Sequence, residues 1–362
     1  MSLNNDPCSK KIRFTNLDIL KFAAAVLIIC HHFQQTTGIR YSVVNFWEGG
    51  FYVGYLSELF FMISGYLMQH SFKKRRGGYI GFFLYKYVRL LPTVFLACIF
   101  QLGVMYVFYK INGAGLFGGF YPVSDVIATL LLVQYGYIAR PTAVNAAVWY
   151  LCVLVQCYLI YCLIQFVCEK SGGKIKVWHL YAVTVFLSLM SDFLVPKSLY
   201  LPFLNDTSSR GITTFFTGAL IYMLQKSDKK MLLRALRVIS VCLCIPAYFL
   251  LYRSVYVLMF MAYPLLVDAA SSAKQLGGKV FAFLGDITLD MYLWHIPMIY
   301  LFFAILLTMG LISLDTVFML CAVVVITIIF AAVYNVLAEK PMQRAIKNLF
   351  AANTREAEKD AI

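Results

Sequence analysis

The stretch "LDILKFAAAVLIICHHF", residues 17–33, decides the class of this protein, because an apolar run of helical length is interrupted by ionisable side chains. Asp18 and Lys21 lie near its start, and His31 and His32 lie near its end. With its flanks, the run is long enough to cross a bilayer as a helix. Charged groups in such a helix are costly and usually face a bundle interior or an aqueous cavity. The stretch therefore predicts a membrane helix with one polar side.

Helix geometry separates these four groups. Lys21 and His32 are eleven residues apart, which is about three turns and roughly 16 Å along the axis, so they share a face. Asp18 lies one turn before Lys21, at a spacing that lets the two side chains meet. His31 points away from this face. The geometry predicts a polar stripe of Asp18, Lys21 and His32, in which Asp18 balances the charge of Lys21.

Composition indicates a polytopic membrane protein. The 362 residues are 61% hydrophobic and 13% charged, whereas a soluble domain is about half apolar and a quarter charged. The net charge of +14 fits the excess of Lys and Arg on cytoplasmic loops better than it fits nucleic-acid binding, which we do not expect. Most of the ten cysteines lie in apolar runs without a paired motif, so neither disulfides nor a bound metal are indicated.

Apolar segments of suitable length predict an all-α bundle of about ten transmembrane helices. The expected spans are 15–33, 50–70, 86–108, 146–168, 177–195, 211–225, 238–252, 254–270, 281–309 and 316–338. A further apolar stretch, 123–137, is expected to be re-entrant or interfacial, because most of the 31 Lys and Arg residues then fall on one side. By the positive-inside rule, both termini are expected to be cytoplasmic. This divides the chain into three parts: an N-terminal tail (1–14), one integral-membrane domain (15–340) and a C-terminal tail (341–362).

Several other apolar runs also carry polar or aromatic residues that are candidates for function. Interfacial snorkelling would explain basic residues near helix ends equally well, and membrane-belt packing would explain tryptophan. The candidates, in chain order, are Glu58 and Ser64 in "SELFFMISGYLM", Lys86 and Arg89 in "FLYKYVRLLP", Trp149 in "AVWYLCVLVQ", and Tyr292 and His295 in "FLGDITLDMYLWHIP".

Taken in order, these motifs resemble the acyltransferase 3 family of bacterial integral-membrane O-acyltransferases, which acylate cell-surface carbohydrates. The first helix of that family has a basic residue, ten intervening residues and a histidine, matched here by Lys21 and His32, with Lys in place of the usual Arg. The family's "FFxxSGY" run is matched by residues 60–66. Its basic-x-x-Arg motif before Leu-Pro is matched by Lys86 and Arg89.

The resemblance continues to the C-terminal region. The family's "YLWHxP" motif is matched from Tyr292 through His295 to Pro297, and its final "ExP" by Glu339 and Pro341. It therefore covers nearly the whole chain.

One motif departs from the family pattern. Of the expected Trp-x-Leu-x-x-Glu, Trp149 and Leu151 match, but Leu154 stands where the acid is expected. Glu58 or Gln156 would be the substitute.

The resemblance implies transfer of an acyl group, usually acetyl, from cytoplasmic acyl-CoA to a hydroxyl of an extracytoplasmic carbohydrate. Acyl-CoA would be a co-substrate, with no permanently bound cofactor, and the acceptor would be a surface glycan or a lipid-linked sugar. The enzyme would lie in the bacterial cytoplasmic membrane, among its lipids. The residues expected to act are His32 as catalytic base with Lys21, Asp18 and Glu58; Lys86, Arg89 and Ser64 toward the donor; and Trp149, Tyr292 and His295 toward the acceptor.

Two other classes of protein are compatible with the polar stripe. A secondary transporter would use Asp18, Lys21 and His32 as a proton or substrate relay. A structural or sensory membrane protein would use its polar groups only to pack helices. Specific binding or hydrolysis of acyl-CoA would separate the acyltransferase from both.

Overall fold

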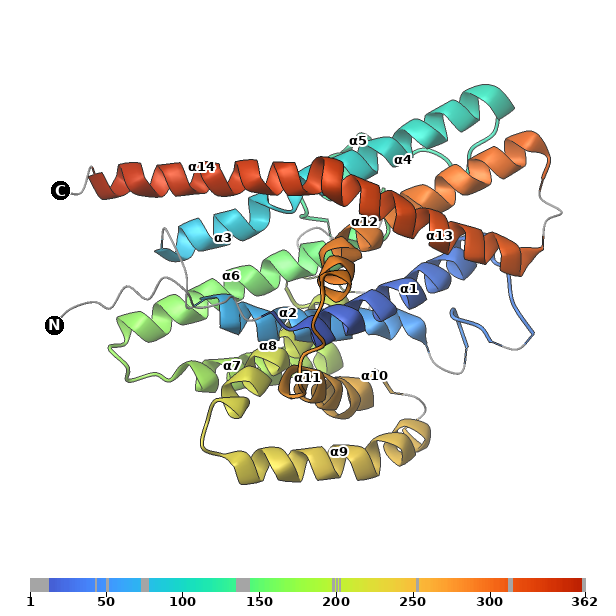
Figure 1. Cartoon of the computed structure of the whole chain (residues 1–362). Coiled ribbons are helices and arrows are strands. Elements are labelled where there is room, and N and C mark those ends of the chain that lie inside the picture. The colour runs from blue at the N-terminus through green and yellow to red at the C-terminus, as the bar shows by residue number, and fades with distance from the viewer. Residues whose placement is uncertain are drawn as a thin grey trace.

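The computed structural model describes residues 13–42, 44–49, 52–72, 78–134, 144–196, 199, 201, 203–251, 254–311 and 315–359, and this part of the chain is helical without β-strands (Figure 1). The helices are α1 (Thr15–Thr37), η1 (Val53–Tyr55), α2 (Leu56–Phe72), α3 (Gly78–Val88), α4 (Leu91–Asn112), α5 (Val123–Leu130), α6 (Val148–Lys170), α7 (Val177–Leu194), α8 (Asp206–Gln225), α9 (Lys230–Leu250), α10 (Val255–Val257), η2 (Leu258–Ala262), α11 (Tyr263–Ser272), α12 (Lys279–Met309), α13 (Thr316–Tyr334), η3 (Asn335–Glu339) and α14 (Lys340–Lys359).

The predicted polytopic helical bundle is confirmed. Within the described residues, eight helical segments are long and apolar enough to cross a membrane. Each of the ten predicted spans overlaps a helix, although the bounds differ. The span 86–108 runs from the last turn of α3 into α4, 254–270 covers the continuous run from α10 to α11, and 50–70 corresponds to α2, which begins only at Leu56. The two spans beyond the eight are α2, which has 17 residues, and α8, whose first turns are polar. Both of these helices bury most of their residues inside the bundle.

The stretch 123–137 does not form a spanning helix in its described part. Helix α5 has eight residues and is therefore about 12 Å long, which is less than half of a bilayer core. The chain after it is hydrogen-bonded into the bundle, since the Tyr87 hydroxyl donates to the Leu131 carbonyl at 2.8 Å. Residues 135–143 lie outside the described part of the chain. The eight-residue helix agrees with a re-entrant or interfacial segment.

Helix α9 begins earlier than predicted. Its first residue is Lys230, whereas the apolar pattern placed the start at 238, because Arg234 and Arg237 were assigned to a cytoplasmic loop. Long basic side chains can lie at a helix end and reach the interface, so they do not stop the helix. The guanidinium of Arg237 pairs with the carboxylate of Asp268 in α11, with Nη2 at 3.1 Å from Oδ1.

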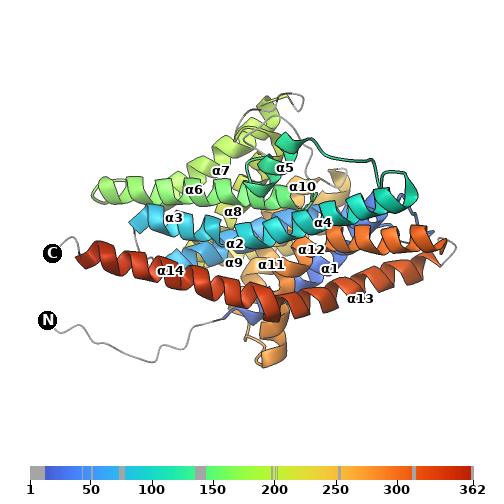
Figure 2. The ribbon, with the colours of Figure 1, turned by 90° about the horizontal axis from the view of Figure 1, so that it is seen from above.

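The region after Glu339 is also helical. Helices α13, η3 and α14 form one continuous rod that passes beside α3 (Figures 1 and 2). The Gln343 amide donates to the Arg89 carbonyl at 2.9 Å, and the ring of Phe350 lies 5.7 Å from that of Tyr85. Most of the segment predicted as a C-terminal tail is thus a helix packed on α3.

Helices α2 and α8 run parallel and touch backbone to backbone. A Cβ atom on Gly65 would lie 1.8 Å from the carbonyl oxygen of Phe215, and one on Gly218 would lie 2.0 Å from that of Met62. Only glycine permits this approach, because such distances are far inside van der Waals contact. The parallel arrangement brings the first turns of both helices to the same end of the bundle.

The opposite end of the bundle is closed by an ion-pair network. Arg13 bridges Asp18 of α1 at 2.7 Å and Asp286 of α12 at 2.9 Å, and Lys340 of α14 contacts Asp286 at 3.2 Å. The described start of α1 and the start of α14 therefore lie at one end, as the predicted topology requires. We call this end the termini side.

Candidate active site

A cavity of about 280 Å³ opens at the end opposite the termini side. The last turns of α1 and the first turns of α2, α6 and α8 form most of its wall, with α12 behind them. The side chains that bear on its chemistry are His31, His32, Gln35, Tyr52, Tyr55, Ser57, Glu58, Trp149, Thr207, Arg210 and Tyr292.

His32 lies between two other imidazoles. Its ring centroid is 5.0 Å from that of His31 and 5.0 Å from that of His295 on α12. The Nδ1 atom of His32 is 2.8 Å from Oε1 of Gln35, so this amide oxygen accepts the Nδ1–H. In the neutral ring, Nε2 then carries the lone pair that a general base needs.

His295 stands behind His32 and is fully buried. Its Nδ1 donates to the Tyr292 carbonyl at 2.7 Å, since a carbonyl can only accept. Its Nε2 has no hydrogen-bond partner among the described residues. The sequence predicts His32 and His295 as site residues on different helices, and the fold brings their rings together.

His31 also lines the cavity, but it is tied to the loop that precedes α2. Its Nδ1 donates to the Phe46 carbonyl at 2.9 Å, and its ring lies 5.1 Å from that of Tyr52. The contacts of His31 therefore position the cavity wall.

The start of α6 is fixed to α12 by a residue that sequence reasoning missed. Asn145 is fully buried, and its Nδ2 donates to the Leu293 carbonyl at 2.7 Å. This bond places Trp149 of α6 and Tyr292 of α12 on the same cavity, so these two predicted acceptor residues are brought together. A lone Asn in an apolar context was the only sequence signal.

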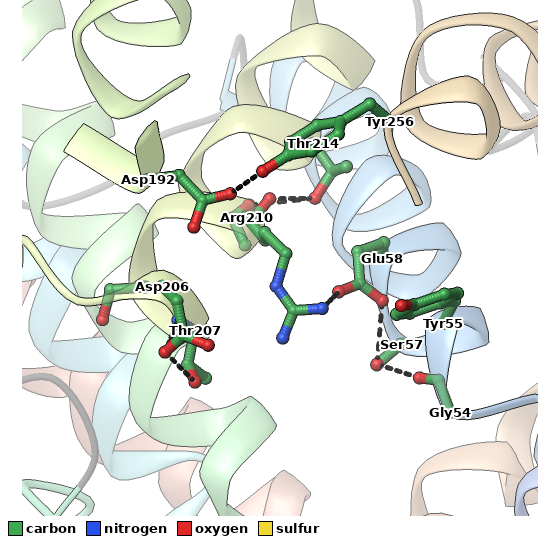
Figure 3. Close-up of polar contacts among 12 residues, drawn as sticks. Gly54, Tyr55, Ser57, Glu58, Asp192, Asp206, Thr207, Arg210, Thr214 and Tyr256 are labelled. Atoms are coloured by element: carbon green, nitrogen blue, oxygen red, sulfur yellow. Dashed lines mark hydrogen bonds and ion pairs between the residues drawn. The ribbon is translucent and has the colours of Figure 1, made fainter. Parts of the chain in front are cut away.

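Glu58 is paired with Arg210, a second residue that sequence reasoning missed. The Glu58 side chain is 2% exposed, and its Oε1 lies 3.2 Å from Nη1 of Arg210 (Figure 3). The sequence placed Arg210 in an outer loop before a span that began at 211. That boundary was wrong, because α8 begins at Asp206 with Asn205 as its N-cap.

The predicted donor residues do not line this cavity. The ammonium of Lys86 lies 5.9 Å from the Tyr158 ring centroid, and the Ser64 hydroxyl is 3.0 Å from that of Tyr150. Arg89 follows α3 and is held to α14 through its carbonyl. Lys86 and Arg89 thus lie toward the termini side, with Ser64 deeper in α2.

The two ends of the polar stripe of α1 lie in different parts of the structure. Lys21 pairs with Asp18 at 2.8 Å, as the spacing predicts, and Asp18 also binds Arg13. About two and three turns beyond Lys21, Ile28 and His32 line the cavity. Only the His32 end of the stripe belongs to the cavity, because Lys21 is held in the ion-pair network.

Replacing Asp18 by Asn is expected to lower the free energy of unfolding by about 1–3 kcal/mol. The reason is that Lys21 and Arg13 lose the carboxylate they share, although their partial exposure of 21% and 39% reduces the effect. The thermal midpoint in detergent measures it. Glu48→Gln, which breaks a pair with Arg40 whose side chains are both 53% exposed, is the control. Equal midpoints for the two variants would contradict the expectation.

The cavity combines imidazole side chains with a buried acid and aromatic walls. Leu154, at the position of the expected acid, is buried and apolar, and Gln156 is not among the lining residues. Among the described residues that line the cavity, Glu58 is the one with a carboxylate side chain. No group of three or more His, Cys, Asp or Glu residues in the described part is arranged to hold a metal ion.

Comparison with known proteins supplies the family. The sequence model of the acyltransferase domain of acyltransferase family 3 matches residues 14–336. No curated protein and no solved structure matches the chain significantly. The match covers every helix from α1 to α13 and includes all the cavity residues. The chain therefore belongs to the acyltransferase 3 family and is an integral membrane acyltransferase.

Proposed function

We propose that this protein transfers an acetyl group from acyl-CoA, supplied on the termini side, to a hydroxyl of a carbohydrate held in the cavity on the other side. The termini side would be the cytoplasm, and the membrane would be the bacterial cytoplasmic membrane. The acceptor would be a surface glycan or a lipid-linked sugar.

One observation carries the proposal: His32 lies in a cavity that also exposes Trp149 and Tyr292, far along α1 from the ion pair of Lys21. Aromatic walls suit the apolar face of a sugar ring, and the polar side chains between them suit its hydroxyls. Lys86 and Arg89, toward the other side, suit the phosphates of a nucleotide.

The proposed reaction needs one base, and it neither consumes nor releases a proton overall. His32 takes the proton of the acceptor hydroxyl as the oxygen attacks the thioester carbonyl. The tetrahedral intermediate then collapses, the C–S bond breaks, and the leaving thiolate receives the proton from His32. An acetyl ester and free CoA result. Side chains around the cavity hold the acceptor so that its hydroxyl meets the thioester, which lowers the entropic part of the barrier.

Membership of the family favours this reaction over the secondary transporter. The ion pairs of Lys21 and Asp18 also suit a positioning role, since both groups are already held by fixed partners.

Replacing Arg89 by Gln is expected to raise the KM for acetyl-CoA by about tenfold while kcat changes little, because one charge-assisted contact to phosphate is lost. Purified protein and labelled acetyl-CoA give both constants. Lys110→Gln, at the far end of α4 next to Tyr106, is the control and should leave KM unchanged. Absence of any acetyl-CoA turnover by the wild-type protein would contradict the proposed function.

A further inference from the structure

An arginine stands at the beginning of α8, where a cation is unfavourable. Arg210 is the fifth residue of this helix, close to the positive end of the helix dipole. Its side chain is only 22% exposed, so it also loses much of its hydration. A residue that is disfavoured on both grounds requires compensation.

Carboxylates surround Arg210 and supply this compensation. Glu58 is its ion-pair partner, and the charges of Asp206 and Asp192, which lie on the side of Arg210 away from Glu58 (Figure 3), also act on it. Asp192 accepts a hydrogen bond from Tyr256 at 2.6 Å. The other oxygen of Glu58 lies 3.1 Å from the Ser57 hydroxyl, whose single proton is shared with the Gly54 carbonyl at 2.6 Å. Both carboxylate oxygens of Glu58 therefore have a polar neighbour.

The pair is held without using all of its hydrogen-bonding capacity. A guanidinium has five N–H donors. Among the described residues, Arg210 forms one ion pair, through one of its nitrogens, and the partner is Glu58. Both side chains line the cavity that contains His32. A buried Arg–Glu pair that faces an aqueous cavity with spare donors and acceptors is suited to binding a polar ligand.

We propose that Glu58 and Arg210 bind the acceptor sugar as a clamp, and that they select an uncharged ring. This inference rests on the proposed function. Arg210 donates to oxygen atoms of the ring, Glu58 accepts from a neighbouring hydroxyl, and the target hydroxyl is left to face His32. At the position where the family motif has a Glu, this chain has Leu154. The clamp would take over the function of that missing acid.

The preference for a single uncharged ring follows from the volume of the cavity and from the charges near Arg210. A volume of about 280 Å³ lies at the lower limit of small-molecule sites, which suits one sugar ring. Three carboxylates, those of Glu58, Asp192 and Asp206, act on the charge of one guanidinium. An acceptor with a carboxylate or phosphate near the clamp would be repelled, whereas a neutral polyol would satisfy the donors and acceptors of the pair.

The test separates acceptor binding from donor chemistry. Arg210→Gln and Glu58→Gln are compared with wild type, using labelled acetyl-CoA and methyl hexosides as acceptors. We expect each variant to raise the KM for the hexoside at least about tenfold. Monodisperse elution in detergent and unchanged binding of acetyl-CoA, which would contact Lys86 and Arg89 on the termini side, show that each variant is folded. Arg40→Gln, in an exposed ion pair, should behave as wild type.

A second arm tests the charge selection. Wild-type protein is offered a neutral hexoside and the corresponding uronate at equal concentration, and we expect the neutral ring to be acetylated preferentially. The hexoside should also raise the thermal midpoint of the wild type but not of Arg210→Gln. Unchanged KM values in both variants, or preference for the uronate, would overturn the clamp. If the wild type neither hydrolysed acetyl-CoA nor transferred its acetyl group, the proposed function would fail, and this inference with it.

Discussion

Replacing His32 by Ala is expected to lower acetyl transfer by about 10²–10⁴-fold, which is the usual contribution of a general base. His32 is the imidazole that lies between His31 and His295 and opens onto the cavity. Its Nδ1 is engaged by Gln35, which leaves Nε2 to take a proton. Alanine removes this acceptor and leaves the cavity otherwise intact. Transfer of label from acetyl-CoA to a hexoside measures the loss.

His31→Asn is the matched control, one residue away and on the same cavity. An asparagine amide keeps an N–H that donates to the Phe46 carbonyl, which is the contact that His31 makes. We expect activity within about tenfold of wild type, since at most one hydrogen bond is weakened. If His31→Asn lost as much activity as His32→Ala, or if both were fully active, the assignment of His32 as the base would be contradicted.

Replacing Gly218 by Ala is expected to destabilise the protein by about 3 kcal/mol, at the upper end of overpacking effects. The added Cβ would lie 2.0 Å from the Met62 carbonyl oxygen in the backbone of α2. A backbone atom cannot rotate away as a side-chain end can, so α2 and α8 must separate. Because this contact sets Glu58 against Arg210, activity should fall together with stability. The thermal midpoint in detergent and the yield of monodisperse protein measure the effect.

Gly103→Ala is the control for glycine replacement itself. Gly103 lies in α4, and nothing comes within 4 Å of a Cβ built there. Alanine favours the helix by up to about 1 kcal/mol over glycine, so this variant should be at least as stable as wild type. A Gly218→Ala protein as stable as Gly103→Ala would show that α2 and α8 do not pack as described.

The spans could be predicted because each depends on its own residues. Long apolar runs form membrane helices whatever their neighbours are, and each of the ten predicted spans overlaps a helix. Boundaries were less certain where polar residues belong to a helix. The apolar pattern predicted the starts of α8 and α9 one or two turns too late, because it assigned Arg210 and Arg237 to loops. Both arginines are instead paired with carboxylates of other helices, Asp268 and Glu58.

The candidate site was predictable only within single helices. Helix periodicity put Asp18 and His32 on one face of α1, and this needed no tertiary information. The approach of His295 to His32, and the bond from Asn145 that fixes the start of α6, depend on how helices pack. Neither local composition nor spacing carries that information. The ion pair of Glu58 with Arg210 likewise depends on how two helices pack.

Acetyl transfer across a sealed membrane tests directly whether donor and acceptor bind on opposite sides of this protein. Purified protein is reconstituted into vesicles, the molecules with the termini side outward are identified by protease cleavage of a C-terminal tag, and a neutral hexoside is enclosed. Labelled acetyl-CoA is then added outside. We expect acetyl-hexoside inside the vesicles, in proportion to the tag accessible from outside, and none with His32→Ala. Acetylation only when donor and acceptor are on the same side would contradict this expectation.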